Sequence, residues 1–389
     1  MKPVAELINP VVSAIPPSGI RKFFDLVSEM KDAISLGVGE PDFVTPWSIR
    51  EAGIFSLEKG QTYYTSNSGL KELREEISHY LNRKYHLTYH PESEILVTVG
   101  GSEAIDLCIR SLVSAGDEVL IPEPSFVCYT PCVRLAGGTP VPIITKEDDD
   151  FRLTAAQLKA HITPKTKLLV LPYPNNPTGA IMKKSDLEEI AAVLRDTDIL
   201  VLSDEIYSEL TYDCVHTPFA SLPDMQERCI LINGFSKQFA MTGWRLGYAV
   251  GPAPVIAAMT KVHQFAIMSA PTTSQYAACE ALRNCDEDVH AMVQQYNHRR
   301  RFILKSFREM GLSCFEPLGA FYVFPSIKNT GLTSVEFANR LLQKEKVAVI
   351  PGTAFGESGE GYLRCAYAYS LSTIEEALVR INRFVRSIL

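Results

Sequence analysis

The sequence has few of the features that mark membrane, exported or nucleic-acid-binding proteins. It contains no uninterrupted apolar run of about 18 residues, the length that a membrane-spanning helix needs. Residues 1–17 lack the basic start and apolar centre of a secretory signal peptide. Lys and Arg total 38 against 45 Asp and Glu, a formal net charge of −7, so there is no chain-wide basic field to neutralise phosphates. We therefore expect a cytoplasmic protein with no membrane and no nucleic-acid partner.

Cysteine spacing gives no support for a zinc site or a disulfide framework. The chain has nine Cys and no Cys-x-x-Cys pair. The closest two are Cys128 and Cys132, and they lack the paired Cys/His spacing of zinc sites. We expect reduced thiols, as in a cytosolic protein, and no metal.

What the sequence does contain is the pattern of an α/β protein. Its length of 389 residues, with 46% hydrophobic and 21% charged residues, fits a globular chain of two or three structural units. Short runs, several of them apolar at successive positions, alternate with helical patterns between about residues 90 and 270. This alternation predicts a mostly parallel, doubly wound sheet with strands buried on both faces. The runs are Glu94–Val99, Glu118–Ile121, Lys167–Leu171, Asp198–Leu202, Cys229–Asn233 and Leu246–Val250.

Composition changes along the chain suggest its division. Residues 1–45 are Pro-rich and predict an N-terminal arm, with part of a small domain, that packs on that domain or on a neighbouring chain. Residues 46–285 form the expected large domain, and residues 286–389 the expected small α+β domain. Ser185 followed by Glu188 predicts a capping box at one helix start of the large domain. The elements expected in the small domain are a helix to Met310, a strand Ala320–Phe324, a helix Ser334–Lys344, a strand Val347–Ile350 and a helix after Ser372.

Four motifs follow predicted strands, at the edge where open α/β sheets bind ligands. Residues 100–103 (Gly-Gly-Ser-Glu) open a helix, so free N–H groups and the helix dipole there can hold an anion. Taken alone, this is also an ordinary strand-to-helix turn. Residues 174–179 (Pro-Asn-Asn-Pro-Thr-Gly) are explained mostly by turn chemistry, but an Asn amide there can point into the crevice.

The third and fourth motifs carry charged groups. Asp204 ends a very apolar strand, and a carboxylate in such a place costs several kcal/mol unless it meets a cation or a donor. Lys237 follows another strand, and desolvation there lowers the pKa of an amine. Such a lysine is a nucleophile able to form a Schiff base. Arg245 follows eight residues later.

Together these segments resemble the class I and II aminotransferases, the fold-type-I family of pyridoxal 5′-phosphate enzymes. The most diagnostic pieces are Asn176-Pro177-Thr178-Gly179, Asp204-Glu205-Ile206-Tyr207, and Ser236-Lys237 with Gly243-Trp244-Arg245, in the family's order. Residues 35–43 and 362–364 match as well, so the resemblance covers essentially the whole chain. It implies a large domain that carries the cofactor on its parallel sheet and a smaller α+β domain.

The resemblance implies roles around the cofactor ring. Lys237 is similar to the lysine that holds the cofactor covalently and then moves the substrate's proton. Asp204 would pair with the protonated pyridine nitrogen, and Asn176 and Tyr207 would hydrogen-bond the ring's 3-oxygen. Phe126 matches the stacking aromatic, with Tyr129 as a second candidate.

Further roles concern the phosphate and the substrate. The phosphate would lie on the backbone of Gly101, Ser102 and Glu103 at the helix start, with Ser236 and Arg245 adding a hydroxyl and a cation. Many members also carry a phosphate-binding Ser three residues before the lysine, where this chain has Gly234. Tyr64 resembles the tyrosine that reaches the phosphate in the other subunit, which implies a homodimer with shared sites. Arg364 and Gly39 match the positions that bind the substrate α-carboxylate, beside Asn176.

The implied activity is ping-pong transamination from an L-amino acid to a 2-oxo acid such as 2-oxoglutarate. We expect an aspartate or aromatic donor. Residues 263–272 contain no arginine to bind a distal carboxylate, and Arg110 is a candidate reader of such a group from the neighbouring chain. A C–S β-lyase of the cystathionine type remains the alternative on the same fold. A non-catalytic sensor is disfavoured, because the resemblance begins by about residue 20 and the full set of site residues is present.

Overall fold

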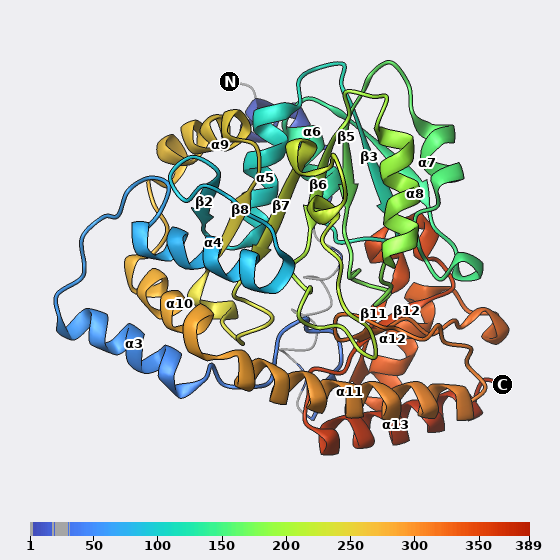
Figure 1. Cartoon of the computed structure of the whole chain (residues 1–389). Helices are drawn as coiled ribbons and strands as arrows, with labels where there is room; N and C mark the ends of the chain where they lie inside the picture. The colour runs from blue at the N-terminus through green and yellow to red at the C-terminus, as the bar shows by residue number, and fades with distance from the viewer. Residues whose placement is uncertain (1–2, 18, 20–29, 31) are drawn as a thin grey trace.

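The computed structural model describes residues 3–17, 19, 30 and 32–389. Seven strands form the main sheet in the order β2-β8-β7-β6-β5-β3-β4 (Figure 1). Strand β8 is antiparallel to both of its neighbours, and the other pairs are parallel, which confirms the expected mostly parallel sheet. The strands are β2 (Ile95–Thr98), β3 (Glu118–Glu123), β4 (Thr139–Ile144), β5 (Thr166–Leu171), β6 (Leu200–Asp204), β7 (Cys229–Gly234) and β8 (Gly247–Val250).

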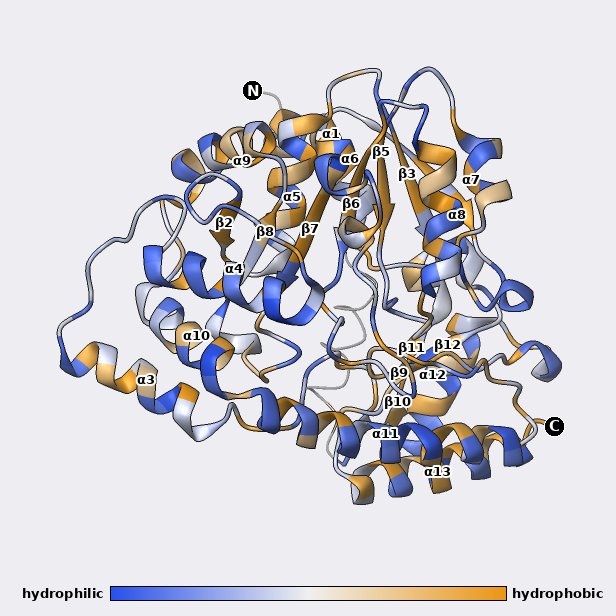
Figure 2. Cartoon of the chain, in the orientation of Figure 1, coloured by the Kyte–Doolittle hydropathy of each residue, from blue (hydrophilic) through white to orange (hydrophobic). Residues whose placement is uncertain are grey.

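The central strands are apolar at successive positions because both faces of the sheet are covered. In β7, Ile230 and Ile232 belong to one buried cluster, whereas Cys229 and Leu231 belong to the other. The hydropathy colouring shows these strands as nearly continuous orange arrows (Figure 2). Side chains that alternate between two cores explain why the sequence shows no polar alternation here.

Helices cover the two faces unequally. Residues of α5, α6 and α9 pack into the smaller cluster, and residues of α4, α7, α8 and α10 into the larger one, which continues into the C-terminal part of the chain. The helices up to α10 are α1 (Pro10–Ser13), α3 (Trp47–Glu58), α4 (Lys71–Tyr85), α5 (Gly101–Leu112), α6 (Tyr129–Leu135), α7 (Ala155–His161), α8 (Lys184–Leu194), α9 (Ala253–Ala266) and α10 (Thr272–Asn284).

The C-terminal part builds two small sheets beside α11 (Asp286–Glu309), α12 (Ser334–Glu345) and α13 (Leu371–Arg386). One sheet is antiparallel, with β12 (Leu363–Ala366) between β11 (Ile350–Pro351) and β9 (Tyr322–Val323). In the other, β1 (Ile34–Ser35) pairs in parallel with β10 (Val347–Ala348), so this piece of the N-terminal segment joins the small sheets. Helix α1 lies beside α6 instead (Figure 2). We keep the division at residues 45 and 285 as a proposal.

Two local expectations are wrong in detail. Val347–Ile350 is not one strand, because β10 and β11 belong to different sheets. The predicted capping box of Ser185 and Glu188 does not form. Helix α8 begins earlier, since the carboxylate of Asp186 accepts the Lys183 N–H at 2.8 Å and places Ser185 inside the first turn.

Short 3-10 turns connect several of these elements. They are η1 (Val4–Leu7), η2 (Glu147–Asp149), η3 (Phe219–Ser221), η4 (Gln226–Arg228), η5 (Thr242–Trp244), η6 (Lys328–Thr330), η7 (Gly352–Phe355) and η8 (Glu357–Gly359). Within the described ranges, no helix combines the length and the apolar character that a membrane crossing needs.

Candidate active site

A pocket opens at the carboxyl ends of β5, β6 and β7, where the small sheets face the large one. This edge is where parallel sheets place their ligands. Eleven of the residues predicted from the sequence line the pocket. They are Gly39, Gly101, Ser102, Phe126, Asn176, Asp204, Tyr207, Ser236, Lys237, Arg245 and Arg364.

Lys237 is a buried amine with a lowered pKa. Burial lowers the pKa of Lys237 to about 8, and the positive charges of Arg364 and Arg245 act in the same direction. Glu40 and Asp204 partly oppose this effect. The Nζ atom donates to the Gly39 carbonyl at 2.8 Å, which holds the amine in the pocket. An amine of this kind is available as a nucleophile and as a proton acceptor near neutral pH.

Asp204 is a buried carboxylate with one strong donor. Burial raises the pKa of Asp204 to about 6, while the hydrogen bond from Tyr129 lowers it. The Tyr129 hydroxyl donates to Asp204 Oδ2 at 2.6 Å, and the Ile206 N–H donates to Oδ1 at 3.3 Å. Tyr129 therefore contacts the carboxylate, and its ring meets Phe126 edge-on at 6.1 Å. This hydrogen bond was not anticipated from the sequence.

The two adjacent Asn have different tasks. The side chain of Asn175 stays within its own loop, where Oδ1 accepts from the N–H and the hydroxyl of Thr178. The side chain of Asn176 faces the pocket, and its Oδ1 accepts from Arg364 Nη1 at 2.9 Å. Because the amide oxygen is occupied, its NH₂ group is the part of Asn176 that can donate to a ligand.

Arg364 is a buried cation in β12. Its Nη2 donates to the Gly37 carbonyl, and its Nε has no hydrogen-bond partner within the described part of the chain. A buried guanidinium N–H without a partner is costly, so it marks a place where a carboxylate oxygen would be stabilised.

The predicted phosphate cradle consists of a helix start, hydroxyls and a cation. Helix α5 begins at Gly101 without a side-chain cap, so its first N–H groups face the pocket edge near Ser102. Ser236 and Arg245 line the same pocket. An uncapped helix N-terminus beside a guanidinium is a favourable anion site.

Glu103 is predicted at this cradle but does not line the pocket. Its Oε1 is 2.8 Å from His263 Nδ1, and its Oε2 accepts the Val99 N–H. The carboxylate is thus turned away, which avoids a negative charge beside a bound anion.

Gly234 stands where the family often has a serine, and the packing explains why. A Cβ built there would lie 3.0 Å from Ile206 Cδ1 and 3.1 Å from the Gly247 Cα and the Leu246 oxygen. A side chain at residue 234 would therefore require Ile206 or the backbone at the start of β8 to shift by a few tenths of an ångström. Ser236 is therefore the nearby hydroxyl that lines the pocket.

Two other predicted residues lie away from the pocket of this single chain. Tyr64 is 80% exposed in the connection between α3 and α4. Arg110 is exposed on α5 and pairs with Asp106, with Nε 2.7 Å from Oδ2.

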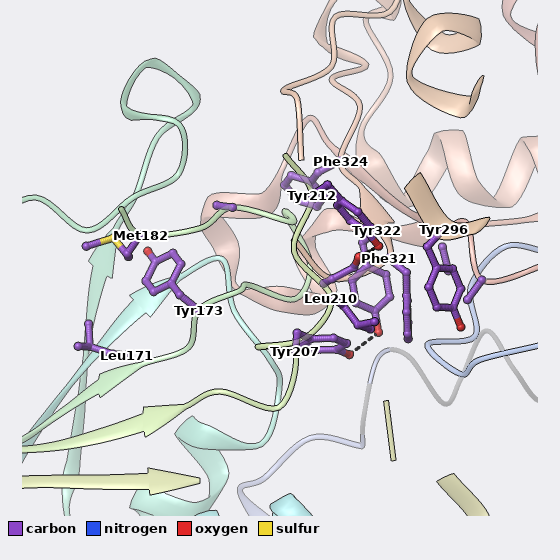
Figure 3. Close-up of a cluster of buried hydrophobic side chains, with 14 of the residues drawn as sticks. Leu171, Tyr173, Met182, Tyr207, Leu210, Tyr212, Tyr296, Phe321, Tyr322 and Phe324 are labelled. Carbon is purple, nitrogen blue, oxygen red and sulfur yellow. Dashed lines mark hydrogen bonds between the residues drawn. The ribbon is translucent and has the colours of Figure 1, made fainter. Parts of the chain in front are cut away.

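Six residues of the pocket wall were given no firm role by the sequence. Tyr322 is the most notable, because its hydroxyl is 2.8 Å from that of Tyr207 (Figure 3). It lies in a short strand-like run far along the chain, and no motif singles it out. The six are Ile105, Tyr129, Pro172, Pro174, Ile206 and Tyr322, of which only Tyr129 had been considered, for stacking. In the described ranges, no cluster of three or more His, Cys, Asp or Glu is arranged to hold a metal ion.

Comparison with known proteins places this geometry in a family. The profile of "Aminotransferase class I and II" matches residues 31–381. The chain belongs to that family. The protein of Bacillus subtilis strain 168 named "Putative aminotransferase YugH" is 54% identical over 97% of this chain and 98% of its own length. An aspartate aminotransferase of Pyrococcus abyssi is 47% identical, with 96% of each chain covered.

A solved structure with a similar fold is also an aminotransferase by its name. The aromatic aminotransferase from Pyrococcus horikoshii OT3 superposes with a TM-score of 0.90 at 44% identity, over 95% of this chain and 99% of that one. The protein is therefore an aminotransferase that depends on pyridoxal 5′-phosphate. The residues of the pocket fit this cofactor: a lysine amine, a buried carboxylate, an uncapped helix start beside an arginine, and an aromatic ring.

Proposed function

We propose that this aminotransferase takes the amino group of aspartate or of an aromatic L-amino acid and gives it to a 2-oxo acid such as 2-oxoglutarate. The observation that carries the proposal is that Lys237 and Arg364 line the same pocket. Lys237 is an amine with a lowered pKa, and Arg364 is a buried guanidinium whose Nε has no hydrogen-bond partner in the described part of the chain. Two of the relatives are named for these substrates: the aspartate aminotransferase of Pyrococcus abyssi and an aromatic-amino-acid aminotransferase of Thermococcus litoralis.

We assign the cofactor-binding roles as follows. When bound, pyridoxal 5′-phosphate supplies an electron-withdrawing ring that stabilises the charge left on a substrate α-carbon after loss of its proton. Lys237 would hold the cofactor covalently, and Phe126 would lie against its ring. Asp204, kept ionised by the hydrogen bond from Tyr129, would face the ring nitrogen. Asn176 and Tyr207 would donate to the 3-oxygen.

The phosphate would lie on Gly101 and Ser102 at the start of α5. Ser236 would donate a hydroxyl hydrogen bond and Arg245 a positive charge. The backbone of Glu103 would complete this turn around the phosphate, while its carboxylate accepts the Val99 N–H.

Proton transfer would use Lys237. With a pKa of about 8, a useful fraction of the amine is neutral near pH 7.5, so Nζ can accept the proton from the substrate α-carbon and return it later. Burial excludes bulk water from this proton. Arg364 would hold the α-carboxylate through its unpartnered Nε and the remaining N–H groups.

The rest of the pocket decides which side chain is accepted. In the described lining, the cations are Lys237, Arg245 and Arg364, and each already has a proposed task. The remaining walls include Ile105, Ile206 and aromatic rings, which suit an apolar or aromatic side chain. Arg110 stays a candidate reader of a distal carboxylate in a partner chain.

We also propose a homodimer in which Tyr64 reaches the phosphate bound to the other chain. Helix α3 lies at the edge of the molecule (Figure 2). Several of its large apolar side chains are exposed, including Trp47, Ile54 and Phe55. The Thr272 hydroxyl donates to the Tyr63 carbonyl, which joins the Tyr64 loop to the start of α10. An exposed apolar surface near Tyr64, which is proposed to reach the other chain's phosphate, is what a contact with a second copy of the chain would need.

A cytoplasmic location is proposed from the thiols. All nine Cys are free, and such a set is typical of a reducing compartment.

The test is a half-reaction without any oxo acid. Excess aspartate, phenylalanine or cystathionine is added to cofactor-loaded protein, and the visible spectrum and released products are followed. Stoichiometric oxo acid from aspartate or phenylalanine supports the proposal and ranks the donors. No reaction with either would overturn the proposed substrates. Pyruvate and ammonia above stoichiometry from cystathionine would instead indicate a C–S β-lyase.

A further inference from the structure

Tyr322 joins two residues that have separate proposed tasks. Its hydroxyl lies 2.8 Å from that of Tyr207, and the two rings meet nearly at right angles with centroids 5.9 Å apart (Figure 3). Tyr207 follows β6 of the large sheet, whereas Tyr322 lies in β9 of a small sheet. Both side chains are buried, so this hydrogen bond is shielded from water.

The ring of Tyr322 also supports Arg364. The guanidinium carbon lies 4.5 Å from the Tyr322 ring centroid and 4.8 Å from that of Phe355. A buried cation against an aromatic face is held in its plane by dispersion and by the ring quadrupole. Tyr322 thus contacts the guanidinium through its ring and Tyr207 through its hydroxyl.

The backbone at Gly39 leaves room for this arrangement. A Cβ built on Gly39 would lie 2.2 Å from Tyr322 Oη, closer than any real contact. The carbonyl of Gly39 also accepts from Lys237 Nζ. The Tyr322 hydroxyl is therefore enclosed between Gly39 and Tyr207.

We propose that Tyr322 is a positioning residue that orients the Tyr207 hydroxyl toward the cofactor's 3-oxygen and the Arg364 guanidinium toward the substrate carboxylate. The inference rests on the proposed functions of Tyr207 and Arg364. Two hydroxyls share one hydrogen bond, and either can donate. When Tyr207 donates to the anionic 3-oxygen, Tyr322 is placed to donate to the Tyr207 hydroxyl. This second hydrogen bond polarises the Tyr207 hydroxyl and strengthens its donation to the 3-oxygen.

The surrounding charges fit this arrangement. Burial raises the pKa of Tyr207 and of Tyr322, so both keep their protons at neutral pH. Arg364 opposes the rise at both hydroxyls, and Asp204 adds to it at Tyr207. Lys237 lines the same pocket.

The first experiment compares Tyr322→Phe and Tyr207→Phe with the wild-type holoenzyme. The readout is the pH midpoint of the bound cofactor's visible absorption, measured without substrate. Weaker donation to the 3-oxygen favours the protonated form of the cofactor linkage. We expect Tyr322→Phe to raise the midpoint by about half a pH unit, and Tyr207→Phe to raise it further, because a neutral hydrogen bond contributes about this much.

Two leucine variants separate the ring from the hydroxyl. Phe355→Leu is the matched control, because Phe355 contacts the guanidinium but has no hydroxyl. We expect it to raise KM for all carboxylate substrates about fivefold with no change in the midpoint. Tyr322→Leu should raise both KM and the midpoint, whereas Tyr322→Phe keeps KM within about twofold of wild type.

The outcomes distinguish the inference from the function beneath it. A raised midpoint in Tyr207→Phe with no change in Tyr322→Phe overturns the role of Tyr322 and leaves that of Tyr207 standing. An unchanged midpoint in both variants overturns both roles. If Tyr322→Leu fails to fold, the comparison of Tyr322→Phe with Tyr207→Phe still decides whether the Tyr322 hydroxyl orients that of Tyr207.

Discussion

Arg364 Nη1 donates to Asn176 Oδ1 at 2.9 Å, and this contact joins the small antiparallel sheet to the loop after β5. The hydrogen bond sets the amide orientation, since the oxygen of Asn176 faces the arginine and its NH₂ group is left to the pocket. The same contact places a guanidinium where the substrate carboxylate is proposed to bind. This one hydrogen bond thus orients the Asn176 amide for the cofactor and the Arg364 guanidinium for the substrate carboxylate.

Lys237→Ala should abolish transamination. The variant loses both the covalent attachment point and the group that moves the substrate proton, whereas the phosphate contacts remain. We expect some cofactor to be retained after gel filtration, but none to be fixed to the protein by borohydride. In the wild type, borohydride followed by peptide mapping should label Lys237. Normal turnover by the variant would contradict the assignment.

Asp204→Ala should lower kcat by several orders of magnitude, because the ring nitrogen loses the anion that keeps it protonated. Asp204→Glu, which keeps the charge, is the control and should retain more activity than Asp204→Ala. Steady-state rates with saturating cofactor measure both. A loss below tenfold in Asp204→Ala would mean that another group faces the ring nitrogen.

Tyr129→Phe should shift the acid limb of the pH profile. The hydrogen bond from Tyr129 lowers the pKa of Asp204, which burial has raised to about 6. Without the donor this pKa rises, so Asp204 becomes protonated at a higher pH and activity falls earlier on acidification. We expect the acid midpoint of kcat/KM to rise by about one pH unit. An unchanged midpoint would show that Tyr129 does not control the charge of Asp204.

Mixed dimers test the shared site. Tyr64→Phe and Lys237→Ala chains are each purified, shown to be nearly inactive, then unfolded and refolded together. If Tyr64 serves the partner's site, one site of each mixed dimer has an intact Lys237 and an intact Tyr64. Activity should then reappear in the mixture. Continued inactivity, with mixed dimers verified by mass spectrometry, would rule out a shared site.

Gly234→Ser should destabilise the protein. The new Cβ would press on Ile206 and on the backbone of β8. We expect a loss of about 1–3 kcal/mol, the usual cost of overpacking a core. Thermal unfolding of the cofactor-free protein measures it, with the exposed Gly243→Ser as control because a Cβ at Gly243 meets nothing within 4 Å. Equal stability of the two variants would contradict the packing argument.

Much of the fold was predictable, because successive apolar residues and strand-end motifs are local signals. Asp204 ends β6, and Lys237 and Asn176 lie in the loops after β7 and β5, so the rule that parallel strands end at one edge brings them together. Sequence alone could not predict Tyr322, since its importance comes from β9 pairing beside β12 rather than from its neighbours in the chain.

Side-chain direction was the other limit. The prediction for Glu103 concerned its backbone in this turn and gave no direction for its carboxylate, which lies against His263 and accepts the Val99 N–H. The capping error at Ser185 has a different origin: Asp186 accepts the N–H of Lys183, so the helix begins at Lys184 and Ser185 lies inside its first turn.

Strands β9 and β12 are neighbours in one sheet, with Tyr322 paired to Ala366 and Arg364 close by on the same strand as Ala366. Arg364 is proposed to bind the carboxylate, and Tyr322, which contacts Arg364, is proposed to orient Tyr207 toward the cofactor, so the binding free energies of the two ligands should be coupled. Thermodynamic linkage makes any such coupling mutual: a carboxylate that orders Arg364 would tighten the hold on the cofactor by the same factor by which the cofactor tightens the hold on the carboxylate.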